Sequence, residues 1–239
     1  MTQFDCYPLP RIDETLDHLS GAQWFTTLDL ISGYWQVKLT PEAQLKSAFC
    51  TRSGLYMWKV MPFGLCNAPS TFERLMERVL QGLHWHTCLV YIDDVVVFGK
   101  SEQELLVRMD EVFSRLQKAG LKVKPRKCCF FARETNYLGH IISGEGVKVG
   151  PEKVAAVREW PVPQNVTELR SFLGTANYYR RFIAGFSAIA APMCDLTAKA
   201  AAFQWTDECQ TAFEKIKAAL CSAPVLAFPV PGAKYRSEE

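Results

Sequence analysis

The stretch CLVYIDDVVVFGK, residues 88 to 100, places two adjacent carboxylates, Asp93 and Asp94, in the middle of an apolar run. The five residues on each side of the pair have strand composition, which predicts two strands joined by a turn at the acids. A buried carboxylate without a partner is costly, whereas Asp in an exposed turn is common because it bonds nearby backbone amides. The stretch alone therefore allows two interpretations, a water-exposed turn or a functional site.

A third carboxylate in a similar setting favours the functional site. Asp29 lies near the end of WFTTLDL, residues 24 to 30, and the turn-prone Ser32 and Gly33 follow it. Carboxylates on neighbouring strand ends can hold two divalent cations about 3.5 to 4 Å apart, as in nucleotidyl transfer. Mg²⁺ prefers such oxygen ligands, and cations offset the repulsion between the acids. Because successive strand side chains point to opposite faces, one of Asp93 and Asp94 is expected to be the principal ligand.

Length and composition are those of a soluble globular protein of one or two domains. The chain has 239 residues, of which 49% are hydrophobic and 22% charged. No apolar run approaches the roughly 20 residues of a membrane helix, and the start, MTQFDCYPLPRIDE, lacks the features of a signal peptide. These features predict an intracellular protein, cytoplasmic or nuclear, without a membrane partner. Residues 101 to 199 carry 15 basic and 10 acidic side chains, which indicates either a polyanion partner or solvated helix faces.

The nine cysteines do not form the paired CxxC pattern of a structural zinc site, so reduced thiols are expected. The nearest approach to a ligand cluster is His84, His86 and Cys88, which alternate along one predicted strand face. Further ligands would have to come from elsewhere in the fold. We therefore predict no zinc site from this trio.

Hydrophobic periodicity predicts strands in the first part of the chain. A short helix carrying Leu16 and ended by Gly21 precedes four expected strands, at 24–30, 35–39, 47–52 and 56–61. Two capping-box spacings, Ser70 to Glu73 and Ser101 to Glu104, predict helix starts, and Gly120 ends the second helix. Further strands are expected at 121–131 and 137–143.

Only helical patterns follow Pro151, at 151–160, 167–183 and 206–220. Strands first and helices later predict an α+β domain followed by a smaller helical one. The glycine cluster between residues 144 and 150 indicates the boundary. The last residues look like the approach to another strand.

Five motifs, in order, resemble those of reverse transcriptases. YIDD at 91–94 looks like the Y-x-D-D signature, and FTTLDLISGYWQV at 25–37 resembles the first palm motif. MPFGLCNAPSTFERLM at 61–76, YLGHIIS at 137–143 and LRSFLGTANYYRRFI at 169–183 are similar to the next motif, the primer grip and the region after it. The order and residues of these motifs are most similar to those of the Pol polyproteins of gypsy-type long-terminal-repeat retrotransposons. The resemblance extends from about Tyr7 to Pro231.

The resemblance implies a fold and a division of the chain. Residues 1–145 would hold part of the fingers and the palm, an antiparallel sheet with packed helices. Residues 146–223 would form a small, mainly helical thumb or connection region. Residues 224–239 would be the truncated start of a ribonuclease H-like domain.

The resemblance also implies roles around the acid pair. Asp29, Asp93 and Asp94 would be the catalytic acids, and together with the backbone carbonyl of Leu30 they would bind two Mg²⁺ ions, with Mn²⁺ as an alternative cofactor. Tyr34 would exclude a 2′-hydroxyl from the nucleotide site, although an aromatic residue of a β core has the same pattern. The implied substrate contacts are Phe63 and Gly64 at the incoming nucleotide and Lys122 or Lys124 near the departing pyrophosphate.

For the primer and nucleic acid, the resemblance implies contacts from Leu138, Gly139, His140, Arg170, Arg180 and Arg181. A surface histidine is the alternative for His140, and a solvated helix face is the alternative for the arginines. The implied partners are an RNA or DNA template with its primer, deoxynucleoside triphosphates (dNTPs) and the rest of a Pol polyprotein.

The resemblance predicts an RNA-directed DNA polymerase, a nucleotidyltransferase, that is a fragment of its polyprotein. The triphosphate-binding hairpin of the fingers would precede Met1. The first ribonuclease H aspartate would come just after residue 235, where the chain instead ends in YRSEE, so no ribonuclease H activity is expected. A catalytically weak remnant that only binds nucleic acid or a partner protein is the alternative. A phosphoacceptor receiver also clusters aspartates, but its strands and helices alternate strictly, unlike the strand run between 24 and 61.

Overall fold

The computed structural model describes residues 3–198 and 203–229, which divide into two compact units. One unit is built on the chain up to Leu138, and the other spans Gly139–Ala227. The sequence placed the boundary slightly later, within the glycine cluster at 144–150. Within the described residues, no helix combines the length and apolar character that crossing a bilayer requires.

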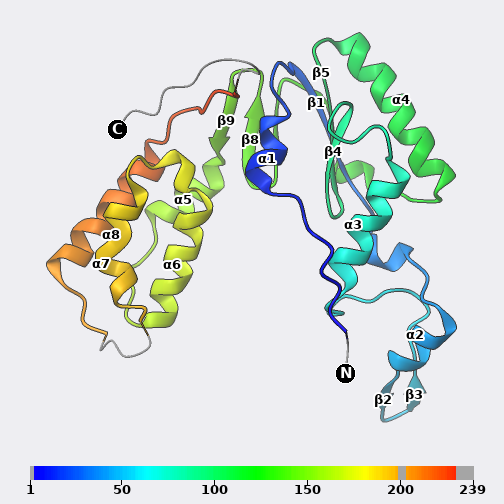
Figure 1. Cartoon of the computed structure of the whole chain (residues 1–239), viewed down its shortest axis with the longest axis horizontal. Coiled ribbons are helices and arrows are strands. Elements are labelled where there is room, and N and C mark those ends of the chain that lie inside the picture. Colours follow the sequence, from blue (N-terminus) through cyan, green and yellow to red (C-terminus); the bar gives the residue numbers. More distant parts are fainter. Residues whose placement is uncertain (1–2, 199–202, 230–239) are drawn as a thin grey trace. The chain divides into compact units, whose positions relative to one another are not determined.

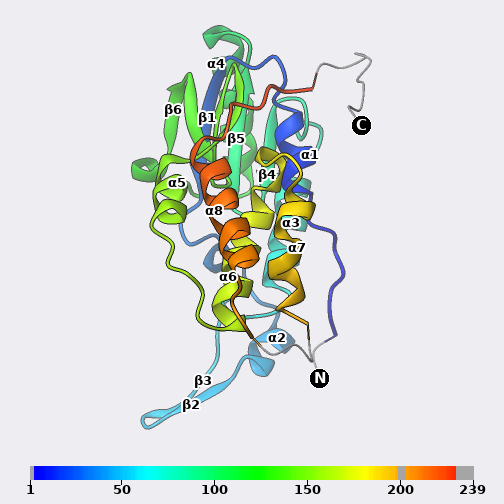
Figure 2. The same cartoon turned by 90° about the vertical axis from the view of Figure 1, so that its left-hand side faces the viewer.

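A four-stranded antiparallel sheet forms the centre of the first unit. Its order is β4 (Cys88–Tyr91), β5 (Asp94–Gly99), β1 (Trp24–Asp29) and β6 (Cys129–Ala132), and Figure 2 shows β6, β1 and β5 side by side. β1 and β5 pair along their whole length, from Trp24 opposite Gly99 to Asp29 opposite Asp94. The sequence stretch with the acid pair is therefore a hairpin, as its composition predicts.

Two helices cover one face of this sheet, α3 (Ala68–Val79) and α4 (Glu102–Lys118) (Figure 1). Leu28 and its ladder partner Val95 point into that core, which they share with Phe72 of α3 and Val112 of α4. Each fully buried side chain of this kind stabilises the fold by roughly 1.5–3 kcal/mol. Because side chains alternate along a strand, Asp29 points to the opposite face.

The remaining elements of the first unit are short. They are α1 (Ile12–Asp17), the 3₁₀ helix η1 (Gly33–Gln36), α2 (Pro41–Lys46), β2 (Phe49–Thr51), β3 (Gly54–Tyr56), η2 (Pro125–Lys127) and β7 (Glu134–Tyr137). β2 and β3 form a hairpin that projects from the body of the unit (Figures 1 and 2). α4 begins as its capping box predicts, because the Ser101 side chain accepts a hydrogen bond from the Glu104 N–H.

The second unit consists of a hairpin and four helices. The hairpin joins β8 (His140–Ser143) to β9 (Gly146–Val149), and the helices are α5 (Pro151–Arg158), α6 (Val166–Tyr178), α7 (Phe186–Asp195) and α8 (Asp207–Cys221), with η3 (Arg180–Phe182) after α6. Phe172 and Phe213, whose ring centroids lie 4.6 Å apart, are fully buried between α6 and α8. The helical character predicted after Pro151 is confirmed.

Three strand predictions are wrong in position. Residues 35–39 form no strand, because Ser32 adopts φ 46° and turns the chain into η1, leaving only a bridge from Lys38 to Val60. The hairpin strand β3 ends at Tyr56, where the sequence predicted a strand to begin. Residues 121–131 are interrupted by η2, so only Cys129–Ala132 is a strand there.

Two further predictions are also wrong in position. Residues 137–143 are not one strand, since Leu138 (φ 49°) and Gly139 (φ 74°) turn the chain between β7 and β8. The Ser70–Glu73 capping box does not form, because α3 begins three residues earlier, with Asn67 in place of Ser70 at its N-cap. Glu73 is instead buried, with a role described below.

Candidate active site

The acid pair lies at a tight hairpin loop with an unusual backbone: Asp93 is in the loop, and Asp94 is the first residue of β5. Tyr91 pairs with Asp94, so Ile92 and Asp93 form the loop of residues 91–94, the acidic turn. Ile92 adopts φ 57° at the first loop position, where hairpins of this kind usually have glycine. A β-branched residue at positive φ is strained and is retained only where surrounding structure fixes it.

Glu73 of α3 fixes this loop from the helical side of the sheet. Its Oε2 accepts the backbone N–H of Ile92 at 2.5 Å, and the residue has no exposed surface. Burial raises the pKa of Glu73 to about 7, against the opposing effect of the Ile92 hydrogen bond. Apart from the misleading capping-box spacing, no pattern in the sequence indicates this contact.

The three carboxylates lie near the end of the sheet where β1 ends and β5 begins. Asp29 and Asp94 are direct ladder partners, so their side chains lie on the same face. Burial, together with the charges of Asp93 and Asp29, raises the pKa of Asp94 to about 6, although Asp94 as a whole residue is exposed. The pKa of Asp93 is also raised, first by burial and then by Asp29. The structure thus places the three acids that the sequence selected close enough for their charges to interact.

A lysine that the sequence did not select is the cation at this site. Lys127 Nζ lies 3.1 Å from Asp29 Oδ2. Its positive charge partly opposes the rise in the pKa values of Asp93 and Asp94. The predicted Lys122 and Lys124 contact the site through backbone groups: the Lys124 N–H donates to the Asp29 carbonyl at 2.8 Å, and the Lys122 carbonyl accepts from Ile31. The basic run LKVKPRK was the available signal, but only η2 reveals which lysine turns toward Asp29.

The backbone of Leu30 is oriented toward the acidic turn. The bridge between Leu30 and Val123 uses the flanking groups, Ile31 N–H with Lys122 O and Lys124 N–H with Asp29 O. The N–H and carbonyl of Leu30 therefore point away from Val123, to the edge of β1 where β5 and Asp93 lie. This orientation fits the predicted use of the Leu30 carbonyl as a ligand.

The donor set has the chemistry of a divalent-cation site. Asp29, Asp93 and Asp94 supply hard oxygen ligands, and Lys127 already brings a positive charge to them. Among the described residues, however, no three His, Cys, Asp or Glu side chains converge closely enough to hold one ion. The three carboxylates therefore match a divalent cation in ligand type and in charge.

Aromatic residues line the region next to Asp93. Tyr34 packs against Phe63 and Phe72, with centroids 5.4 and 5.6 Å away, and its pKa is raised by burial and by Asp93. A Cβ atom at Gly33 would lie 3.2 Å from the Asp93 Cβ, so the two loops approach closely. Phe63 is 62% exposed, and Gly64 follows at φ 89° with open space around it. Tyr34 is thus placed near Asp93, and Phe63 contacts Tyr34, whereas the nucleotide contacts of Tyr34, Phe63 and Gly64 stay predictions.

The second unit holds the remaining predicted residues. His140 is buried at 1% exposure among the rings of Tyr178, Tyr179 and Phe182, so the alternative of a surface histidine is wrong. The Tyr179 hydroxyl donates to the Gly139 carbonyl at 3.1 Å, which fixes the turn that begins at Leu138.

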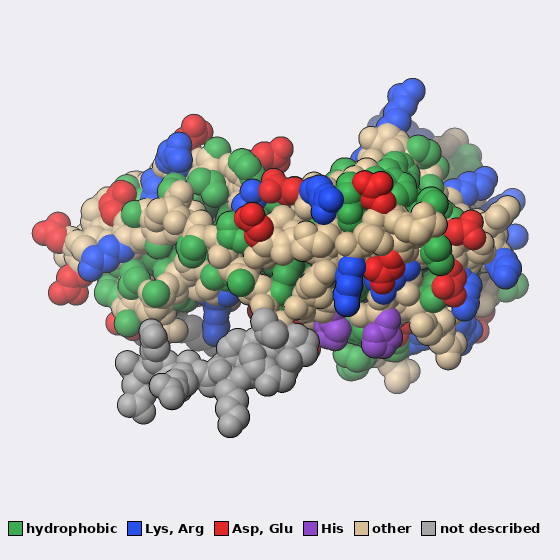
Figure 3. Space-filling view, turned by 90° about the horizontal axis from the view of Figure 1, so that it is seen from above, with side chains coloured by type: hydrophobic (Ala, Val, Ile, Leu, Met, Phe, Trp, Pro, Cys, Tyr) green, Lys and Arg blue, Asp and Glu red, His purple; other side chains and the backbone are tan. Residues whose placement is uncertain are grey.

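The predicted arginines have different surroundings in that unit. Arg170 donates to the Thr197 carbonyl at 2.8 Å, Arg180 is exposed, and Arg181 lies 5.9 Å from the Phe182 ring centre. In the face drawn in Figure 3, Lys and Arg side chains are interspersed with Asp and Glu, without an extended patch of one charge. Nucleic-acid contacts by these arginines stay predictions.

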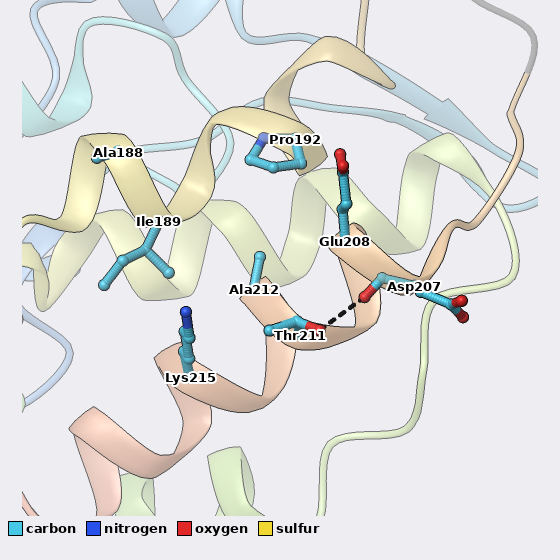
Figure 4. A pocket seen from close by; sticks show the side chains of 8 residues that line it. All are labelled: Ala188, Ile189, Pro192, Asp207, Glu208, Thr211, Ala212 and Lys215. Atoms are coloured by element: carbon cyan, nitrogen blue, oxygen red, sulfur yellow. Dashed lines mark hydrogen bonds between the residues drawn. The ribbon is translucent and has the colours of Figure 1, made fainter.

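A groove of about 350 Å³ lies between α7 and α8 in the second unit (Figure 4). Ile189, Pro192 and Ala212 form its apolar part, while Glu208 and Lys215 stand at separate positions along α8. The Thr211 hydroxyl donates a hydrogen bond to the Asp207 carbonyl at 2.8 Å. The groove lacks converging polar groups of the kind that the acidic turn presents.

An antiparallel sheet backed by helices, with carboxylates at a strand end and an adjoining turn, defines a polymerase palm. The family model described as reverse transcriptase (RNA-dependent DNA polymerase) matches residues 1–142. The chain therefore belongs to the reverse transcriptase family, and the predicted family and fold class are confirmed.

Relatives and solved structures agree with this assignment. The chain is 42% identical over 226 residues to the retrovirus-related Pol polyprotein from transposon 297 of Drosophila melanogaster, covering 94% of this chain and 21% of the relative. It is 43% identical over 192 residues to that from transposon gypsy of the same organism, covering 80% and 19%. The predicted likeness to gypsy-type Pol polyproteins is confirmed. The chain spans about a fifth of the length of these curated relatives.

The fold is similar to that of the foamy viral protease-reverse transcriptase. Its complex with ds DNA superposes with a TM-score of 0.86 at 27% identity, covering 94% of this chain and 40% of that one. Its complex with an RNA/DNA hybrid gives 0.83 at 28% identity, covering 93% and 30%.

Proposed function

We propose that this chain carries the polymerase centre of a retrotransposon Pol polyprotein and acts in RNA-directed DNA synthesis. The observation that supports this most directly is the pairing of Asp29 with Asp94 beside the loop residue Asp93, at the point where β1 ends and β5 begins. The relatives are Pol polyproteins, and the similar foamy viral protein was solved with ds DNA and with an RNA/DNA hybrid. These likenesses support a template–primer duplex as the partner and dNTPs as the substrate.

The reaction is the transfer of a nucleotide to a primer. The primer 3′-oxygen forms a bond to the α-phosphorus of the dNTP as the bond to pyrophosphate breaks, and the hydroxyl proton is lost to solvent. Asp29, Asp93, Asp94 and the Leu30 carbonyl would hold Mg²⁺ or Mn²⁺, as reverse transcriptases generally use divalent metals. When bound, two such ions would activate the hydroxyl and neutralise charge on the phosphates.

The chain's own residues supply the rest of the site. Lys127 offsets the charge of Asp29, and of the nearby lysines it is the one whose ammonium lies at the acids and could support a leaving phosphate. Tyr34, packed between Phe63 and Phe72, would close the floor beneath the nucleotide sugar. Arg180 and the hairpin after Gly139 would contact the duplex.

Primer extension on an RNA template with Mg²⁺ tests the proposal. The unaltered chain is compared with Asp29→Asn and Asp93→Asn, and Glu42→Gln, an exposed carboxylate on α2, is the matched control. Extension by the unaltered chain and the control, with neither aspartate variant active, is expected. Extension that survives both aspartate changes would overturn the assignment, and salt-sensitive duplex binding without any extension would favour the remnant.

A further inference from the structure

The acidic turn depends on a contact outside the group of metal-binding residues. Ile92 precedes Asp93 and holds φ 57°, a conformation that an isolated β-branched residue rarely adopts. The N–H of Ile92 is the group that connects this loop to a neighbouring element.

Glu73 accepts the Ile92 N–H although its side chain is buried among apolar residues. Its neighbours on α3, Phe72 and Met76, are fully buried in the core that the helix shares with the sheet. Within the described part of the chain, its Oε1 has no hydrogen-bond partner, while Oε2 accepts the Ile92 N–H at 2.5 Å. A side chain that only filled space here would be apolar, because burial of a half-satisfied carboxylate is unfavourable.

The contact has the geometry to control where Asp93 points. Helix α3 is anchored in the core and the loop is only two residues long, so fixing the Ile92 amide also fixes the peptide that leads to Asp93. Misplacement of a reacting group by about 1 Å can reduce a rate roughly 10²-fold. A contact one residue away from a metal-binding carboxylate is therefore a determinant of its position.

We propose that Glu73 is a positioning residue, which acts through the Ile92 N–H to hold the acidic turn so that Asp93 presents its carboxylate beside Asp29. The inference rests on the proposed polymerase function for its catalytic consequence. Its structural part, the orientation of the carboxylates, is measurable without catalysis.

Two substitutions separate the acceptor from the bulk of the side chain. Glu73→Gln keeps an oxygen that accepts the Ile92 N–H, whereas Glu73→Leu keeps similar volume without an acceptor and suits the apolar surroundings. Leu80→Ala, at the fully buried C-terminal end of α3, is the control for a loss of core packing. Mn²⁺ titration of the apo chain is the first readout, and hydrogen exchange of the Ile92 amide is the second.

Glu73→Leu is expected to weaken Mn²⁺ binding about 10-fold and to speed exchange of the Ile92 amide at least as much. Glu73→Gln should stay within about threefold of the unaltered chain in both. In primer extension, kcat should fall about 10- to 100-fold in Glu73→Leu with the KM for dNTP little changed. Equal Mn²⁺ affinity in all variants, or an equal loss in Leu80→Ala and Glu73→Leu, would overturn the inference. Altered Mn²⁺ binding in Glu73→Leu with no extension by the unaltered chain would count against the proposed function alone.

Discussion

Asp29 and Asp94 face each other across the β1–β5 ladder at the point where β1 ends and the acidic turn begins. Directly opposed like charges are unfavourable in a sheet, and Lys127 is the nearest charge that offsets them. The opposed carboxylates of Asp29 and Asp94 therefore favour the binding of cations, and without cations their repulsion destabilises the fold. Its energetic consequences can be tested one residue at a time.

The first prediction concerns the unequal roles of the three acids. Asp29→Asn and Asp93→Asn should each lower primer extension by at least about 10³-fold, because electrostatic stabilisation supplies most of the rate in phosphoryl transfer. Asp94→Asn should lower it less, since Asp94 is the exposed member of the set. Single-nucleotide extension on an RNA template measures all three. An equal loss in the three variants would contradict the ranking of Asp94.

The second prediction concerns Lys127, whose ammonium occupies the position of a cation beside Asp29. Lys127→Ala should tighten Mn²⁺ binding to the apo chain several-fold, because a competing positive charge is removed. Mn²⁺ titration at low salt measures the effect, which screening would otherwise weaken. Lys46→Ala, which removes an exposed lysine paired with Glu42, should leave the affinity unchanged. Weaker binding in Lys127→Ala would show that the lysine supports the site in another way.

The third prediction concerns the pH dependence of stability that Glu73 creates. Its pKa rises from 4.5 to about 7 on folding, so the folded state binds the proton more tightly than the unfolded state. The stabilisation is fully present below about pH 4.5 and is lost as the pH rises through about 7. Glu73→Gln removes this term, so its free energy of unfolding relative to the unaltered chain should increase between pH 5 and pH 8 by roughly 2–3 kcal/mol.

Urea unfolding at the two pH values measures that difference. The raised pKa of Asp94 acts in the same direction but is common to both proteins, so it cancels in the comparison. A difference that is constant from pH 5 to pH 8 would mean that Glu73 does not titrate in this range.

The fourth prediction concerns the close approach of η1 to the acidic turn. A methyl group at Gly33 would lie 3.1 Å from a Phe72 ring carbon and 3.2 Å from the Asp93 Cβ. Gly33→Ala should therefore displace the Asp93 loop and lower primer extension about 10-fold, with little change in duplex affinity. Gly64→Ala is a comparison without a steric conflict, because no atom lies within 4 Å of its added Cβ, although its φ of 89° adds backbone strain. Full activity in Gly33→Ala would show that the loop adjusts freely.

The acids were predictable from the sequence because their signal is local. Asp29, Asp93 and Asp94 stand out as charges within strand-like apolar runs, and the alternation of a strand indicates which side chains share a face. The hairpin of β4 and β5 follows from the same composition. The family resemblance added order to these motifs, and the match to residues 1–142 agrees with it.

Glu73 and Lys127 were not predictable because their roles depend on contacts between distant segments. The spacing from Ser70 to Glu73 fits a capping box, but Asn67 and the following Pro69 place the start of α3 earlier. Glu73 then faces the sheet and meets Ile92, which is 19 residues away. Lys127 lies 98 residues from Asp29, and only the 3₁₀ turn at residues 125–127 orients it.

The last prediction concerns Gly146 at the start of β9, in the second unit. Gly146 adopts φ 142°, and a Cβ atom there would come within 2.1 Å of the Leu226 carbonyl oxygen. That carbonyl accepts the Val147 N–H at 2.9 Å, and the Leu226 N–H donates to Val147 at 2.8 Å, so backbone rather than a flexible side chain would have to move. Gly146→Ala should therefore separate the Leu226 segment from β9 and destabilise the second unit by more than about 2 kcal/mol.

Hydrogen exchange of the Val147 and Leu226 amides reports this separation directly, and a thermal melt reports its effect on stability. The matched control is Gly174→Ala in α6, where no atom lies within 4 Å of the added methyl group and the backbone is helical. That substitution should raise the free energy of unfolding by up to about 1 kcal/mol, because alanine is the better helix former. Amides of Val147 and Leu226 that stay protected in Gly146→Ala would contradict the close packing of β9 against residue 226. The changes in the free energy of unfolding expected for the two glycine variants have opposite signs because the backbone geometry at the two positions differs.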